Sequence, residues 1–175
     1  DQFWLPMIGS FKDKKFISIT QGQINLDDLD EKNKDKDIEN KEQKEKQDKE
    51  FVDLIAQMKV VLGEQVKDIR LSSKLTDSPV CLVADDGDMD IAMEQLMAQR
   101  DTNYKGAPRI LEINGDHSLI KNMKSLLSKK ENNDLVSDAG TLLFEQARLM
   151  EGKMPSDPAQ FSKIMNQFLL KVIPE

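Results

Sequence analysis

The chain has 175 residues, of which 38% are hydrophobic and 33% charged, with a net charge of −7. This length and composition predict one compact domain with an appendage. They argue against nucleic-acid binding, because every lysine-rich run is interleaved with Asp or Glu. They also argue against a membrane protein, because no apolar run approaches the roughly 20 residues that span a bilayer.

The first half of the chain contains one predicted strand and one highly charged segment. Phe16 to Thr20 is rich in β-branched and aromatic residues, which favours a strand. Asp27 to Glu50 contains eleven acidic and seven basic residues among twenty-four. Such a stretch buries too little apolar surface to offset its ordering entropy, so we expect a solvated hinge or a frayed charged helix rather than a specific binding tail.

A core-facing helix and a small sheet are predicted next. Apolar residues recur at three- and four-residue steps from Phe51 to Leu62, and Gly63 supplies the stop. Residues 66–71, 80–84 and 109–113 are three strands that can form one sheet. Cys81, the single cysteine, lies in the second of these apolar runs, which favours a small buried hydrophobe in a reducing compartment. We therefore expect a cytoplasmic protein.

A methionine stripe lies between the second and third strands. On a predicted helix over residues 89–99, the apolar side is formed by Met89, Met93, Leu96 and Met97. The opposite side, which we expect to be polar, carries Asp90, Glu94 and Gln95. Methionine at helical spacing is more often core, yet flexible methionine also suits a surface that accepts varied apolar partners. The residues alone leave both interpretations open.

No metal site is predicted. The acidic run from Asp85 to Asp88 suggests a calcium loop, but its first and last ligand positions would fall on Leu82 and Met93. His117 has no second His and no Cys at ligand spacing, so we expect it to cap or pack rather than to bind metal or transfer protons.

Three helices are predicted after His117, and the last two carry apolar stripes. Asp157 and Pro158 suit the cap and the first position of the final helix. One stripe contains Leu135, Ala139, Leu142, Leu143 and Gln146, and the other contains Phe161, Ile164, Met165, Phe168 and Leu169. Packing within the chain explains such stripes, and a second copy of the chain is the alternative.

Residues 66–117 resemble a known family. The matching segments, in order and spacing, are Asp68-Ile69-Arg70-Leu71, Leu75-Thr76-Asp77-Ser78-Pro79, Val80 to Val83, Leu111-Glu112-Ile113-Asn114 and Asp116-His117. They resemble the C-terminal dimerisation domain of the heat-shock protein 90 chaperones of the bacterial HtpG type. Gly115 departs from the family, which usually has proline there.

The resemblance implies three regions: the tail of a middle domain at 1–26, a charged linker at 27–49 and a C-terminal dimerisation domain at 50–175. The implied fold is α+β, with a small three-stranded sheet and a C-terminal helix pair that forms a two-fold four-helix bundle. The ten stripe residues from Leu135 to Leu169 named above would form the contact of a homodimer.

The resemblance also implies a function. Non-native client proteins would bind to an exposed apolar surface formed by Trp4, Met89, Met93, Leu96 and Met97. ATP and magnesium would belong to the full-length protein, with no catalytic residue and no cofactor in this part. The chain begins at Asp1 without Met and ends without the acidic Met-Glu-Glu-Val-Asp tail that recruits co-chaperones, so we expect a piece of a longer protein that lacks that docking motif. The alternative function is a helix-binding adaptor with one specific protein partner.

Overall fold

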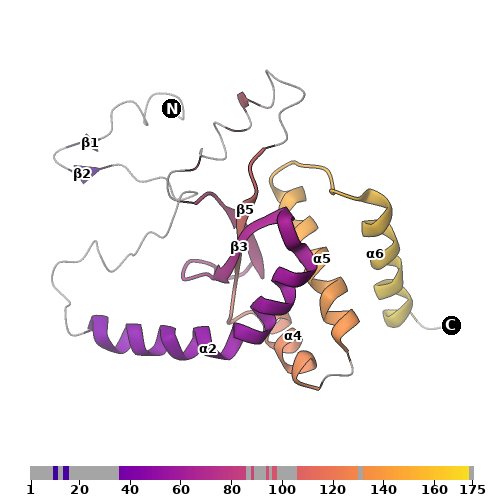
Figure 1. Ribbon diagram of the computed structural model, residues 1–175, viewed down its shortest axis with the longest axis horizontal. Coiled ribbons are helices and arrows are strands. Elements are labelled where there is room, and N and C mark those ends of the chain that lie inside the picture. Colours follow the sequence, from indigo (N-terminus) through magenta and orange to yellow (C-terminus); the bar gives the residue numbers. More distant parts are fainter. Residues whose placement is uncertain are drawn as a thin grey trace.

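The computed structural model describes residues 10–11, 14–15, 36–85, 88, 94, 96–97, 106–129 and 132–173, with the backbone alone at 14–15 and 36–47. The elements, drawn in Figure 1, are β1 (Ser10–Phe11), β2 (Lys14–Lys15), α2 (Lys36–Leu62), the 3₁₀ turn η2 (Gly63–Gln65), β3 (Val66–Leu71), β4 (Val80–Val83), β5 (Arg109–Ile113), α4 (Ser118–Ser128), α5 (Asn133–Met150) and α6 (Pro158–Val172). This is the predicted α+β class. The expected strand at 16–20 lies outside the described residues.

The first long helix begins earlier than the sequence pattern predicted. We expected it to start at Phe51, where the apolar period begins, but α2 already starts at Lys36 and ends at Leu62. Lys, Glu and Gln dominate the added turns, and these residues have high helix propensity even where no apolar face is present. The expected boundary between linker and domain, at residues 49 and 50, therefore lies inside one continuous helix.

The predicted sheet is confirmed, and its order is β3-β5-β4. β5 pairs in parallel with β3 and antiparallel with β4, so the sheet is mixed. Asn114, which follows β5, fixes the connection between the two outer strands. Its side-chain amide donates to the carbonyl oxygens of Thr76 and Ser78, at 3.1 and 3.2 Å, and its backbone N–H donates to that of Pro79 at 2.8 Å.

One hydrophobic core joins the sheet to the helices. It contains Phe51, Leu54, Met58 and Leu62 of α2, Leu111 and Ile113 of β5, Ile120 and Met123 of α4, and Val136, Leu143, Phe144 and Ala147 of α5. Gly140 lies where α5 packs against α2, since a Cβ at this position would make an ordinary van der Waals contact with Cγ of Met58, at 3.4 Å. The aliphatic core expected from the composition is therefore formed mainly by three helices and the middle strand.

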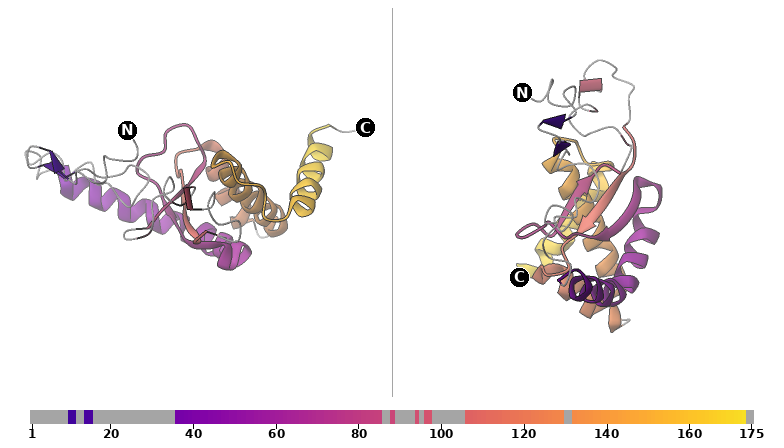
Figure 2. Two further views of the ribbon diagram at one scale, coloured as in Figure 1. Left: turned by 90° about the horizontal axis from the view of Figure 1, so that it is seen from above. Right: turned by 90° about the vertical axis from the view of Figure 1, so that its left-hand side faces the viewer.

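The C-terminal helix lies at the margin of the molecule. Figures 1 and 2 show α6 beside α5 and away from the sheet. The predicted cap is confirmed: Oδ1 of Asp157 accepts from the N–H groups of Ala159 and Gln160, at 3.0 and 2.9 Å, and Pro158 is the first helical residue. The three predicted helices after His117 are present, while the two-fold bundle requires a second copy of the chain and stays a prediction.

Candidate functional site

The apolar stripe of α6 is covered along only one edge. Ile164 is 3% exposed and faces the chain's own core, whereas Leu169 is 48% and Val172 77% exposed. Because each helical residue turns by about 100°, Phe168, Phe161 and Met165 lie between these extremes, and they are half-buried or exposed. A continuous apolar face of α6 thus runs from the contact with α5 out into solvent.

The adjoining side of α5 continues this face. Leu135, Ala139 and Leu142 are half-buried and Gln146 is exposed, while Leu143, which adjoins this stripe around the helix, packs in the core. The last turn of α5 adds two exposed side chains, Leu149 and Met150. We call the set Leu135, Ala139, Leu142, Leu149, Met150, Phe161, Met165, Phe168, Leu169 and Val172 the helical face. Leu143 and Ile164, which we predicted as interface residues, are each 3% exposed because they pack within the chain. They are therefore not included in the helical face.

A polar clamp fixes the angle between the two helices. The carboxylate of Glu145, buried in α5, accepts hydrogen bonds from the backbone N–H of Ser156, at 3.0 and 3.1 Å, and from its hydroxyl. Arg148 donates from Nη2 to the carbonyl oxygen of Met154 at 3.0 Å. Gly152 makes the turn with a left-handed φ of +77°. The helical face is therefore held by a defined loop, although sequence periodicity gave no sign of the clamp.

The second candidate surface is the methionine helix, of which the structure describes Glu94, Leu96 and Met97, all in helical conformation. Met97 is 42% exposed and Leu96 is half-buried. Their role as client-binding residues stays a prediction. Trp4, Met89 and Met93, the other predicted client-binding residues, lie outside the described residues.

Glu94, which we predicted on the polar side of this helix, is buried. Its side chain is 4% exposed and paired with the equally buried Arg109 of β5. A buried carboxylate is tolerated where a cation and hydrogen bonds satisfy it. The inner side of this helix is thus polar and paired rather than polar and solvated.

The turn before the methionine helix is tied to β3 by charge. Nζ of Lys67 lies 2.9 Å from carboxylate oxygens of both Asp85 and Asp88. Hydrogen bonds to these two carboxylates raise the pKa of Lys67. Asp85 and Asp88, two of the acidic residues that suggested a calcium loop, are therefore paired with Lys67. Within the described part of the chain, no group of three or more His, Cys, Asp or Glu side chains is placed to hold a metal ion.

His117 has the predicted capping role. Its Nδ1 accepts a hydrogen bond of 3.1 Å from the backbone N–H of Leu119 at the start of α4. Gly115, the departure from the family pattern, packs closely, since a Cβ there would lie 3.2 Å from Cδ2 of Leu71. The turn is also closed by Asn114, whose Oδ1 accepts from the N–H of Asp116 at 3.0 Å.

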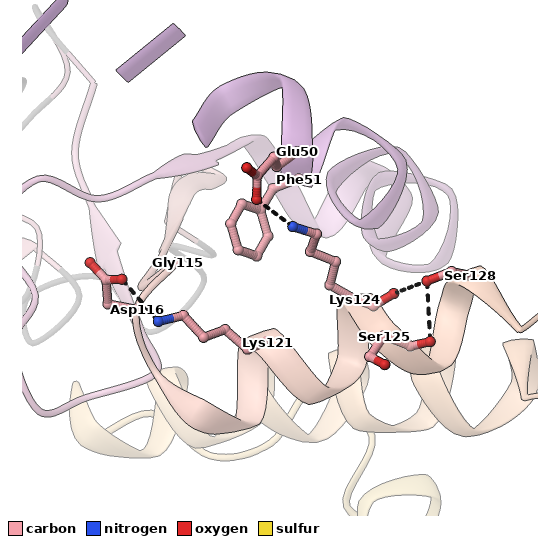
Figure 3. Close-up of a pocket in the computed structure, with 8 residues that line it drawn as sticks. All are labelled: Glu50, Phe51, Gly115, Asp116, Lys121, Lys124, Ser125 and Ser128. Atoms are coloured by element: carbon pink, nitrogen blue, oxygen red, sulfur yellow. Dashed lines mark hydrogen bonds and ion pairs between the residues drawn. The ribbon is translucent and has the colours of Figure 1, made fainter. Parts of the chain in front are cut away.

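An open pocket of about 570 Å³ lies between α2 and α4 (Figure 3). Lys124 extends to Glu50 at 2.6 Å and lies over the ring of Phe51, and Lys121 extends to Asp116 at 3.0 Å. The hydrogen bond from Lys124 lowers the pKa of Glu50. Because each lysine already has a carboxylate partner, this pocket offers little uncompensated charge to a ligand, and we assign it no role.

Comparison with known proteins gives a consistent picture. The family model described as Hsp90 protein matches residues 1–174. The chaperone protein HtpG of Roseobacter denitrificans is 42% identical over 163 residues, which are 92% of this chain and 26% of that protein. The corresponding protein of Wolbachia sp. subsp. Brugia malayi is 38% identical over 99% of this chain and 27% of its own length, and that of Streptomyces coelicolor is 34% identical over 94% and 25%. The chain spans about a quarter of the length of the curated relatives it matches. None of the described helices is both long and apolar enough to pass through a bilayer.

Proposed function

This chain belongs to the Hsp90 protein family, and from that premise we propose that it is the dimerisation and client-binding part of a molecular chaperone of the HtpG type. The helical face would join two copies of the chain, and the methionine helix would bind non-native proteins. ATP and magnesium would act in another part of the complete protein, which we place in the cytoplasm. The roles of this chain are to hold two arms together and to present an apolar surface.

The observation that carries the proposal is the uncovered stripe of α6. Of the large apolar side chains on this helix, only Ile164 is fully buried, whereas Leu169, Leu170 and Val172 remain exposed. Full burial of one such side chain contributes about 1.5 to 3 kcal/mol. Association costs roughly 4 to 15 kcal/mol. Several residues from both copies must therefore be buried together, and the continuous helical face offers that many.

A second copy is the partner that this surface fits best. A contact between two identical helix pairs is self-complementary, so one apolar face serves both sides of a two-fold interface. None of the ten side chains of the helical face is charged, although Nζ of Lys171 lies 5.6 Å from the ring centre of Phe168. Two such pairs would meet as the four-helix bundle implied by the family.

The client-binding role rests on the exposure of Met97. An exposed methionine on a helix that is fixed on its inner side can adapt to varied apolar side chains without disturbing the fold. Leu96 is half-buried beside it and would add to the same surface.

The oligomeric state tests the proposal directly. Light scattering at tens of micromolar should return twice the chain mass of 19.9 kDa. Leu169→Asp should yield a folded monomer, because a carboxylate would be desolvated at the contact. Val60→Asp is the matched control, since Val60 is exposed on α2 and away from the helical face. A monomeric wild type, or equal dissociation of the two variants, would contradict the proposal.

A further inference from the structure

Three elements of the chain converge on the side chain of Glu94. Its carboxylate is paired with the guanidinium of Arg109 at the start of β5, and both side chains are 4% exposed. Oε1 also accepts a hydrogen bond of 2.9 Å from the backbone N–H of Ala107. Oε2 lies 4.0 Å from Nζ of Lys153, in the loop between α5 and α6. One carboxylate on the methionine helix thus contacts the sheet, the segment before it and the loop that carries α6.

The backbone near the carboxylate is shaped to leave room for it. Gly106 has a φ of +74°, a conformation that favours glycine. A Cβ at this position would collide with Oε1 of Glu94. Glycine here therefore serves two purposes, the left-handed turn into β5 and the space in which the carboxylate lies. The site is built around Glu94.

We propose that Glu94 is a positioning residue that anchors the inner side of the methionine helix, so that Met97 is held facing solvent. A buried carboxylate can lie only where its charge is paired, and here the paired position is defined by Arg109 and the Ala107 N–H. Glu94 and Met97 are three residues apart and lie about 60° apart around the helix axis, so anchoring Glu94 also fixes Met97 at the border between the buried side and solvent, where it is 42% exposed. This inference deepens the proposed client-binding role and rests on it for its functional consequence.

The anchor also links the two proposed surfaces. Lys153 is shared between Glu94 and Glu151, with the latter at 3.0 Å, and lies three residues before the Ser156 that is clamped by Glu145. The loop that sets the angle of α6 is therefore in contact with the residue that sets the direction of the methionine helix. Loss of the Glu94 charge should release both the helix and this loop contact.

Two substitutions remove the anchor by different routes, and each has a matched control. Glu94→Gln removes the charge, and Glu112→Gln removes the charge of another buried carboxylate, which pairs with Arg70 of β3. Gly106→Ala displaces the Glu94 carboxylate. Gly63→Ala, at the end of α2, imposes a left-handed penalty of the same kind, at a φ of +51°, where a Cβ meets nothing within 4 Å.

Hydrogen–deuterium exchange of peptides that cover residues 94–97 is the primary measurement, with thermal melting to establish that each variant is folded. We expect exchange to become about tenfold faster, or more, in Glu94→Gln and Gly106→Ala, because a broken buried ion pair is strongly destabilising locally. Glu112→Gln and Gly63→Ala should leave exchange in these peptides near the wild-type rate. Unchanged exchange in both anchor variants, or equal acceleration in the controls, would overturn the inference.

A second measurement separates the anchor from the proposed function. Binding to reduced, carboxymethylated α-lactalbumin, which is permanently unfolded, should weaken in Glu94→Gln and Gly106→Ala and persist in the two controls. If exchange accelerates as expected while binding is unchanged, the anchor stands and the client-binding role of this helix is wrong. If exchange is unchanged, the anchor is wrong whatever the binding shows.

Discussion

Arg70 of β3 donates two hydrogen bonds to one carboxylate oxygen of Glu112 in β5, from Nε at 3.1 Å and from Nη2 at 2.9 Å. The two residues face each other in the parallel register of the sheet. The other carboxylate oxygen accepts from the hydroxyl of Ser72 at 2.8 Å. The middle strand thus carries a buried charge whose two oxygens are both satisfied, at the position where the outer strand β3 ends.

We predict that Glu112→Ala lowers the free energy of unfolding by about 3 kcal/mol, because it leaves the largely buried Arg70 without its carboxylate. Asp116→Ala, which removes the exposed partner of Lys121, should cost less than about 1 kcal/mol. Urea denaturation of both variants measures the difference. Similar losses in the two variants would show that the Arg70–Glu112 pair contributes little beyond an exposed pair.

Cys81 gives a prediction that depends on pH. It pairs with Glu112 in the sheet register, and burial together with the Glu112 charge raises the pKa of its thiol from 9.0 to about 11. At pH 8 only roughly one thousandth of the folded protein should carry the thiolate. Alkylation by iodoacetamide should therefore be slow in the folded chain and fast in urea, where the thiol titrates normally.

The raised pKa of Cys81 also determines how the free energy of unfolding changes with pH. Between pH 9 and about 11 the unfolded chain releases the thiol proton while the folded chain keeps it. The free energy of unfolding therefore decreases as the pH rises through this range. Below pH 9 the Cys81 thiol has no effect on it. Cys81→Ser should reduce that part of the pH dependence. Rapid alkylation of the folded protein at pH 8 would show that the thiol is not held in this environment.

The third prediction concerns the N-cap of α6. Asp157 accepts hydrogen bonds from two backbone N–H groups at the start of the helix that carries half of the helical face. Asp157→Ala should destabilise the chain by about 1 kcal/mol and increase amide exchange in the first turn of α6. Ser162→Ala, at an exposed position within the same helix, is the control. An unchanged first turn in Asp157→Ala would mean that Pro158 alone fixes the helix start.

The sequence predicted those parts of the fold that local chemistry decides. The strands at 66–71, 80–83 and 109–113 follow from apolar, β-branched runs bounded by turn residues, and they appear within a residue of the predicted ends. Gly63 and Gly152 terminate helices with positive φ, as their residue type indicates. His117 and Asp157 cap as expected, because a capping hydrogen bond depends on residues only two or three positions away.

Side-chain pairing between distant elements was not predictable in the same way. Nothing in the local pattern of Glu94 distinguishes it from Asp90 or Gln95, and its burial depends on Arg109, fifteen residues away on a strand. The apolar stripe of α5 also wraps around the helix, so periodicity alone did not separate Leu142, which lies toward solvent, from Leu143, which lies in the core. In both cases tertiary packing determines which side chain is buried, and the helical periodicity of the sequence does not.

The last prediction concerns Met97 and separates a client surface from a core position. Because Met97 is 42% exposed, Met97→Ser should change the free energy of unfolding by no more than about 0.5 kcal/mol. A core methionine such as Met58 should lose roughly 2 to 5 kcal/mol on a comparable truncation. Urea denaturation of Met97→Ser and Met58→Ala tests this contrast.

Binding of unfolded protein should depend on Met97 even though stability does not. Met97→Ser should bind reduced, carboxymethylated α-lactalbumin more weakly, whereas Val60→Ser, at an exposed position on α2, should bind it as the wild type does. Binding to several unrelated unfolded proteins distinguishes a chaperone surface from an adaptor with one partner, because an adaptor would retain only its own ligand. If Met97→Ser binds all of them normally while remaining folded, the methionine helix is not the client surface, and the function of this chain reduces to dimerisation.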